Sequence, residues 1–117
     1  MSRLALYSID GSPNIVMDVE TLRVVEPVSV RNVFDEYDGR EIVWRLEPNR
    51  KYLVISMIRL VGGGYDVWVY LCTIPRDNTI LYEKKRHFWA KTIASAVGKA
   101  LKDMKLLKKE EIPPLIN

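Results

Sequence analysis

The sequence predicts an α+β fold: an antiparallel β-meander of about four strands with a long C-terminal amphipathic helix packed on one face, preceded by an N-terminal hairpin and a short helix. Two apolar runs flank three consecutive glycines, Gly62–Gly64, and shorter alternating runs precede and follow them. Near the C-terminus, apolar residues recur at steps of three and four. These patterns indicate a hairpin, neighbouring strands and one helix face. The 117 residues suit a single domain, 1–117, divided into 1–39, 40–84 and 85–109.

The first part is expected to form a hairpin and then a short helix. Leu4–Asp10 and Ile15–Val19 are apolar runs separated by an Asp-Gly-Ser-Pro turn signal. Ser29 can cap a helix, because its hydroxyl can accept an unpaired N–H of the first turn. The apolar residues that follow have helical spacing: Val30, Val33, Phe34 and Tyr37. The alternative is a hairpin whose turn is Asp38-Gly39.

The central prediction is the hairpin around Gly62–Gly64. A three-residue loop pairs Arg59 with Val67 and Met57 with Val69, and side chains alternate between faces along each strand. One face then carries an aliphatic set: Leu53, Ile55, Met57, Val67, Val69 and Leu71. The other face is mixed and aromatic: Tyr52, Val54, Ser56, Ile58, Asp66, Trp68, Tyr70 and Cys72.

The neighbouring strands are expected to extend the same sheet, so that the meander spans Arg40–Glu83. Glu41–Glu47 alternates strictly, and Pro48-Asn49 suits a tight turn that pairs Glu47 with Arg50. That pairing places three side chains beside Leu53 and Ile55: Ile42, Trp44 and Leu46. Beyond the hairpin, pairing Ile74 with Thr79 adds two more to the core face: Ile80 and Tyr82.

The C-terminal helix is expected over residues 85–109. Its apolar stripe comprises Trp89, Ile93, Val97, Ala100, Met104 and Leu107. Its opposite side carries Lys91, Ser95, Lys99, Lys102, Lys105 and Lys109. The predicted core therefore comprises Trp44, Leu53, Ile55, Val69, Leu71, Trp89, Ile93 and Val97.

Charge is divided unevenly along the chain. Residues 1–48 hold five Lys+Arg and nine Asp+Glu, a balance of −4, and residues 49–117 hold thirteen and six, a balance of +7. There is one Cys, no secretory signal pattern and no run of about 18 apolar residues, which favours a cytoplasmic protein. The absence of Gln beside abundant Lys and Glu is typical of thermophiles.

Aromatic and basic residues share the second face of the predicted sheet and its margins. Single-stranded nucleic acid is bound by aromatic rings that stack on bases and by cations that pair with phosphates. The predicted nucleic-acid-binding residues are Arg45, Arg50, Tyr52, Trp68, Tyr70, Lys84, Lys85 and Arg86. The expected function is non-enzymatic binding of single-stranded DNA or RNA by this sheet face and by the basic region of the C-terminal helix. The alternatives are a solvated helix exterior and a second face covered by residues 1–39 or by another copy of the chain, as in a protein–protein interaction module or a homodimer.

Catalytic patterns are sparse, and no cofactor or metal is expected. His87 is the only histidine, and Cys72 lies within a predicted strand. The glycine run lacks the Lys-Ser/Thr of a phosphate-binding loop. Asp66 followed by Glu83-Lys84-Lys85 resembles the Asp…Glu-x-Lys core of metal-dependent nucleases, which gives a minor alternative with Asp66, Glu83 and Lys85 as the site. In the predicted register Asp66 pairs with His87, and Lys85 with Trp68.

A meander followed by a long helix, with basic and aromatic sheet residues, resembles two groups of single-strand binders over about Arg40–Lys109. One group is the whirly and transcription-coactivator type. The other is the ThermoDBP-related proteins of thermophilic archaea. The resemblance is one of architecture, and it implies binding of single-stranded DNA without assigning any residue.

Overall fold

The computed structural model describes residues 1–33 and 38–105 and is mostly β. The described chain contains seven antiparallel strands and one C-terminal helix. In chain order the elements are β1 (Ser2–Ser8), β2 (Asn14–Asp18), β3 (Ser29–Val33), β4 (Gly39–Leu46), β5 (Arg50–Arg59), β6 (Tyr65–Ile74), β7 (Leu81–Ala90) and α1 (Ile93–Asp103). They form two sheets, with strand orders β1-β4-β3 and β2-β5-β6-β7. Antiparallel strands and a C-terminal helix were correctly predicted, whereas a single meander and an N-terminal helix were not.

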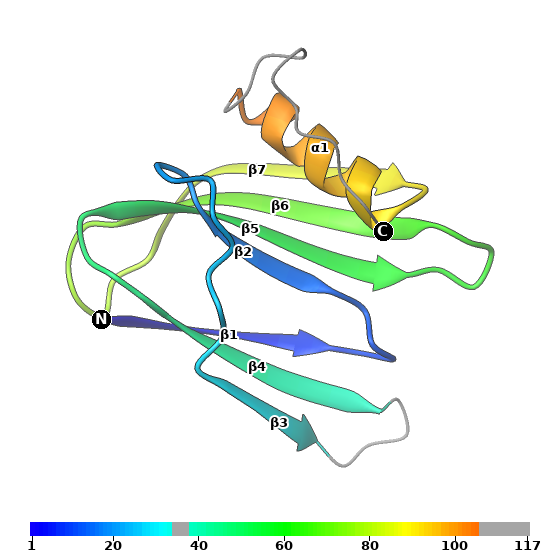
Figure 1. The fold of residues 1–117 in the computed structure, drawn as a ribbon, viewed down its shortest axis with the longest axis horizontal. Coiled ribbons are helices and arrows are strands. Elements are labelled where there is room, and N and C mark those ends of the chain that lie inside the picture. The colour runs from blue at the N-terminus through cyan, green and yellow to red at the C-terminus, as the bar shows by residue number, and fades with distance from the viewer. Residues whose placement is uncertain (34–37, 106–117) are drawn as a thin grey trace.

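The four-stranded sheet is the centre of the fold, and each of its faces has a different cover (Figure 1). On the face that we call the helix face, α1 lies over β6 and β7. The core on this side joins Leu53, Ile55, Met57, Val67, Val69 and Leu71 to Ala96, Val97, Ala100 and Leu101 of α1. On the opposite face, called the inner face, the three-stranded sheet contributes Leu4, Trp44 and Leu46, which pack with Val16, Tyr52, Val54, Cys72 and Ile74.

The β5–β6 hairpin confirms the predicted faces but corrects the register. Arg59 pairs with Tyr65, and Met57 pairs with Val67, so the loop covers residues 60–64. The partners are displaced by two residues from the predicted ones. Because side chains alternate with a period of two, such a displacement leaves each side chain on its predicted face.

β4 does not pair with β5, so the predicted meander is wrong at this point. β2 occupies that edge of β5, and β4 lies between β1 and β3 in the other sheet. At the Pro48-Asn49 corner, Asn49 has a φ of 63°, and its N–H donates to the Ile74 carbonyl at 2.6 Å. The corner therefore carries the chain from one sheet to the other. Three side chains consequently pack on the inner face rather than beside Leu53 and Ile55: Ile42, Trp44 and Leu46.

β1 and β2 do not form the predicted N-terminal hairpin, because they belong to different sheets. In the turn between them, Asp10 and Gly11 have φ values of 52° and 71°. The Ser12 Oγ accepts a hydrogen bond from the Arg59 N–H at 3.1 Å. This bond fastens the turn to the end of β5, so the chain crosses between the sheets here.

Residues 29–33 form β3 and not the predicted short helix. Val30 and Val33 pair with β4 in an antiparallel hairpin, which is the alternative with a turn near Asp38-Gly39. β-Branched side chains favour an extended chain, and pairing with β4 decides in favour of the strand. Residues 34–37 lie outside the described part of the chain.

The β6–β7 pairing also departs from the predicted register. Thr73 pairs with Leu81, and a bulge at Glu83 then shifts the partners by one further residue. A bulge adds one residue to a single strand and locally increases its twist. Ile80 and Tyr82 therefore lie on the inner side and not on the helix face.

β7 continues to Ala90, so α1 begins later than the predicted residue 85. Thr92 is the N-cap: its Oγ1 accepts from the Ser95 N–H at 3.1 Å, and the Ser95 Oγ accepts from the Thr92 N–H at 3.1 Å. This reciprocal capping box fixes the start of the helix. Trp89 consequently lies on a strand and is 57% exposed, whereas the prediction put it in the core. The other predicted core residues are buried or partly buried.

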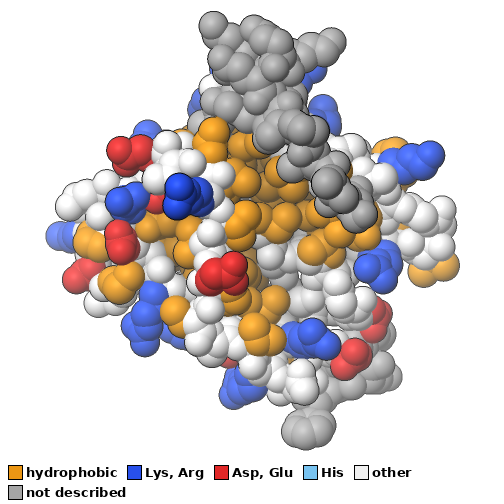
Figure 2. All heavy atoms as spheres, viewed as in Figure 1, with side chains coloured by type: hydrophobic (Ala, Val, Ile, Leu, Met, Phe, Trp, Pro, Cys, Tyr) orange, Lys and Arg blue, Asp and Glu red, His pale blue; other side chains and the backbone are white. Residues whose placement is uncertain are grey.

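α1 turns its apolar side to the sheet and its lysines to solvent. Gly98 is buried in mid-helix, and Lys99 and Lys102 are exposed. Residues 106–109 of the predicted helix lie outside the described part. Hydrophobic side chains gather below α1 in the middle of the viewed face, and Lys and Arg stand at its rim (Figure 2). Within the described residues, no helix is long and apolar enough to cross a membrane.

The helix-face core predicts the effect of a buried charge. Val69 is fully buried, so Val69→Asp is expected to lower the free energy of unfolding by several kcal/mol, because an unpaired carboxylate there cannot be hydrated. Val61→Asp is the matched control, because Val61 is fully exposed in the β5–β6 loop. Urea denaturation followed by circular dichroism measures both, and wild-type stability of Val69→Asp would contradict the fold.

Candidate nucleic-acid interface

The inner face of the four-stranded sheet is only partly covered. The pairing aligns its side chains in rows across the strands: Asp18, Tyr52, Cys72 and Tyr82; Val16, Val54, Tyr70 and Lys85; Asn14, Ser56, Trp68 and His87; Ile58, Asp66 and Trp89. The three-stranded sheet packs on the β2 and β5 part of the first two rows and on Cys72 of β6. The remaining side chains of β6 and β7 in these rows are half-buried or exposed. One of them is the Asp66 carboxylate, and we call the other six the open aromatic face: Trp68, Tyr70, Tyr82, Lys85, His87 and Trp89.

A stacked ring pair forms the middle of the open aromatic face. The Trp68 and His87 rings, from paired positions on β6 and β7, have centroids 4.3 Å apart and planes inclined by 12°. The His87 Nε2 also lies 2.6 Å from the Asp66 Oδ1. Asp66 therefore orients the imidazole, and the stack holds both rings in fixed positions.

Trp89 depends on a glycine in the β5–β6 loop. A Cβ placed on Gly64 would lie 2.6 Å from the Trp89 indole, so the ring rests directly on the glycine backbone. Gly64 also has a φ of +77°, where a side chain is strained. One side of the Trp89 ring thus packs on the loop, and 57% of the residue stays exposed.

The other end of the open aromatic face borders a groove between β1 and β7. The Tyr70 and Tyr82 rings meet edge to face, with centroids 5.6 Å apart and an interplanar angle of 71°. Lys85 pairs with Tyr70, which places it on the same face. On this face of β7, Lys85 thus lies between the Tyr82 ring and the His87 and Trp89 rings.

Only part of the predicted binding set comes together here. Trp68, Tyr70 and Lys85 belong to the open aromatic face. Lys84 pairs with Leu71 and Arg86 with Val69, so both side chains point to the helix face. The other three predicted residues, Arg45, Arg50 and Tyr52, lie in a different part of the fold.

The remaining predicted residues lie at the Pro48-Asn49 end of the sheets. Tyr52 is 3% exposed, and its hydroxyl accepts from the Glu47 N–H at 2.9 Å, so its ring is part of the core and not a stacking platform. Arg45 lies opposite Arg3 in the three-stranded sheet, with its side chain exposed. Arg50 is held in ion pairs, described next.

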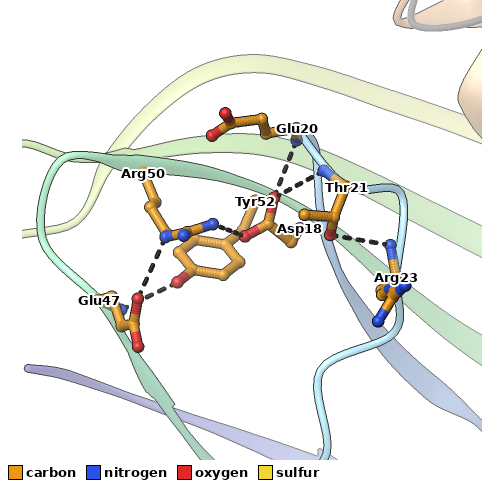
Figure 3. Close-up of polar contacts among 7 residues, drawn as sticks. All are labelled: Asp18, Glu20, Thr21, Arg23, Glu47, Arg50 and Tyr52. Atoms are coloured by element: carbon orange, nitrogen blue, oxygen red, sulfur yellow. Dashed lines mark hydrogen bonds and ion pairs between the residues drawn. The ribbon is translucent and has the colours of Figure 1, made fainter.

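A polar network joins the end of β2 to the start of β5 (Figure 3). The Asp18 carboxylate accepts from the Glu20 and Thr21 N–H groups at 2.9 and 3.1 Å and from the Arg50 guanidinium at 2.6 Å. Arg50 also pairs with Glu47 at 3.1 Å. Burial by itself raises the pKa of Asp18, but the hydrogen bonds and the Arg50 charge outweigh it, so the pKa lies below its ordinary value of 3.8. The network fixes the corner between the sheets, which gives Arg50 a structural role.

Three members of the open aromatic face were not in the predicted set: Tyr82, His87 and Trp89. The signal was present in residues 81–90, where Lys85, His87 and Trp89 alternate with Arg86 and Phe88. A helical period that begins at Trp89 conceals this alternation, and the Thr92-x-x-Ser95 cap marks the true helix start.

The residues of the nuclease alternative do not converge. Asp66 pairs with Trp89, and Glu83 lies six residues before Trp89 on β7, or about 20 Å along the strand. The Glu83 carboxylate accepts from the Thr73 hydroxyl and the Lys51 ammonium, and Lys85 pairs with Tyr70 rather than with Trp68. Within residues 1–33 and 38–105, no three His, Cys, Asp or Glu side chains cluster as metal ligands. Burial raises the pKa of the Cys72 thiol to about 12, which leaves it protonated and unreactive.

Comparison with known proteins adds no family to this geometry: no family model, no curated protein and no solved structure matches the chain. In the described residues, the structure is defined by two antiparallel sheets, one helix and a partly open inner face.

Replacing Gly64 tests whether the Trp89 indole packs on the glycine backbone. Gly64→Ala is expected to lower the free energy of unfolding by about 1–3 kcal/mol and to change the Trp fluorescence, because the new Cβ clashes with the indole in a strained conformation. Gly62→Ala is the control, because Gly62 has no left-handed φ and nothing lies within 4 Å of its Cβ position. Equal stability and equal fluorescence spectra of the two variants would contradict the packing of Trp89 on Gly64.

The lowered pKa of Asp18 predicts a pH dependence. Ionised Asp18 stabilises the fold above pH 3.8, and this contribution is lost as the pH falls through the lower folded value. Asp18→Asn keeps an acceptor for the turn N–H groups but loses the charge, so it should cost about 1 kcal/mol at neutral pH, a figure discounted because Arg50 is partly exposed. Urea denaturation at neutral pH and well below pH 3.8 should show the difference from wild type shrinking in acid. Glu47→Gln, at an exposed partner of Arg50, should change little.

Proposed function

We propose that this protein binds single-stranded nucleic acid, without catalysis, on the open aromatic face. The observation that carries the proposal is that Trp68, Tyr70, His87 and Trp89 share one accessible face with Lys85. Bases stack on such rings, and a lysine beside them pairs with the phosphate.

Charge and shape both favour a flexible polyanion. Lys84, Lys85 and Arg86 follow one another on β7, and none of the three forms an ion pair within the described residues. β7 is the edge strand of its sheet, so a strand lying along it meets no neighbouring strand. A duplex presents paired, stacked bases that these rings cannot reach, so single strands should bind more tightly.

A protein–protein interface remains the second candidate, because β7 is a ten-residue edge strand with Leu81, Tyr82 and Trp89 more than half exposed. Unpaired edges can accept another strand, but lysines on an edge oppose such pairing. Two copies of β7 paired about their centres would bring Lys84, Lys85 and Arg86 together in both chains. Like charges in that position make self-association the weaker proposal.

The test is fluorescence anisotropy with labelled single- and double-stranded oligonucleotides at low and moderate salt. Single strands are expected to bind more tightly, with affinity falling as salt rises because counterions are released from the phosphates. Trp68→Ala should weaken binding by about 1–3 kcal/mol, the cost of one stacked base. Tyr7→Ala is the control, because Tyr7 is an exposed aromatic residue in the other sheet.

A charge pair completes this test. Lys85→Glu should weaken binding and flatten its salt dependence, whereas Lys102→Glu, on α1 at the helix face, should leave both nearly unchanged. No binding of any oligonucleotide at low salt, or equal effects of the two lysine variants, would overturn the proposal. Light scattering at two concentrations tests the alternative of self-association.

A further inference from the structure

A groove adjoins the open aromatic face where the two sheets separate. It runs between β1 and the β6–β7 pair and has a cavity volume of about 500 Å³. One wall is aliphatic, formed by Leu4 and Leu6 of β1 with Val54 of β5. The other wall is aromatic, formed by Tyr70 and Tyr82. The volume lies in the range of small-molecule sites, about 300–1,000 Å³.

The rim of this groove is positively charged. Lys85, opposite Tyr70 on the inner face, lines it, and its ammonium group forms no ion pair in the described part of the chain. Glu83 and Lys84 also border the groove, but their side chains point to the helix face. Lys84 pairs with Leu71 there, and the Glu83 carboxylate accepts from the Thr73 hydroxyl and the Lys51 ammonium. The rim therefore offers one cation, Lys85, to a ligand.

We propose that the groove takes one nucleotide of the bound strand, with the base between the aliphatic and tyrosine walls and the phosphate on Lys85. This inference rests on the proposed function and names the anchoring site within it. A flat, largely apolar group joined to an anion is the chemistry that the groove selects, and a nucleotide has both parts. One flat face of a base can pack on the aliphatic wall while the other face stacks on the tyrosine rings.

The strand can continue from the groove onto the rest of the open aromatic face. Successive rows on β7, those of Lys85, His87 and Trp89, are two residues apart, or about 7 Å along the strand. That distance is about twice the 3.4 Å rise of one nucleotide in a stacked helix, which leaves room for a ring between neighbouring bases. The groove thus fixes one nucleotide, and the rings beyond it stack on the next ones.

The experiment fills the groove from the β1 side. Leu6→Trp places an indole in the space for the base, and Ala5→Trp is the matched control because Ala5 is exposed and alternates to the other face of β1. Each protein is titrated with labelled oligothymidylate and, in competition, with thymidine monophosphate, thymidine and inorganic phosphate. We expect thymidine monophosphate to compete with the oligonucleotide better than thymidine or phosphate does. We expect Leu6→Trp to lose that competition and to bind the oligonucleotide about tenfold or more weakly, with Ala5→Trp unchanged.

Tyr82→Ala keeps the test valid if Leu6→Trp is unstable. Tyr82 is 57% exposed, so its removal spares the core but deletes one wall, and it should reproduce the loss of thymidine monophosphate binding. If both variants bind like the wild type while Trp68→Ala still weakens oligonucleotide binding, the anchoring site is wrong and the proposed function stands. Absence of oligonucleotide binding by the wild-type protein overturns both.

Discussion

The fold depends on one constraint: β5 and β6 are apolar on both faces, so each face of their sheet needs a cover. α1 covers the helix face over β6 and β7, and the three-stranded sheet covers the inner face over β2, β5 and the Cys72–Ile74 end of β6. Burial of apolar area on both sides supplies the main stabilisation, at roughly 25 cal/mol per Å². The chain therefore has to change sheets, and it does so three times: at the turn after β1, between β2 and β3, and at the corner after β4.

Polar groups anchor two of these crossings. The Ser12 hydroxyl ties the turn after β1 to β5, and the Asp18–Arg50 pair ties the corner after β4 to the end of β2. Buried or half-buried polar groups need hydrogen-bond partners, and here the partners come from neighbouring strands of the four-stranded sheet. The same groups that look like surface charge in the sequence thus determine how the sheets are joined.

The open aromatic face exists because the three-stranded sheet is smaller than the inner face that it covers. The three-stranded sheet leaves β7 and the Asp66–Tyr70 part of β6 without a partner sheet, so Trp68, His87 and Trp89 lie together on the uncovered part. β7 is an edge strand whose residues 81–87 are exposed, and α1 packs only near its end, at Phe88 and Ala90. An exposed aromatic face made this way needs no special loop, only a sheet that extends beyond its cover.

Local sequence patterns were enough to assign the two faces of the β5–β6 hairpin, to indicate a C-terminal helix and to place Trp68 and Tyr70 on the same face. Alternation of side chains is a local property, and a displaced register preserves it. The neighbour of each strand was decided only by the tertiary structure, because alternation does not reveal whether β2 or β4 occupies an edge of β5. For the same reason Tyr52 and Arg50 appeared to join Trp68 in a site. Tyr52 is buried because β4 turns away into the three-stranded sheet, and Arg50 is paired because the distant Asp18 turn lies beside it in space.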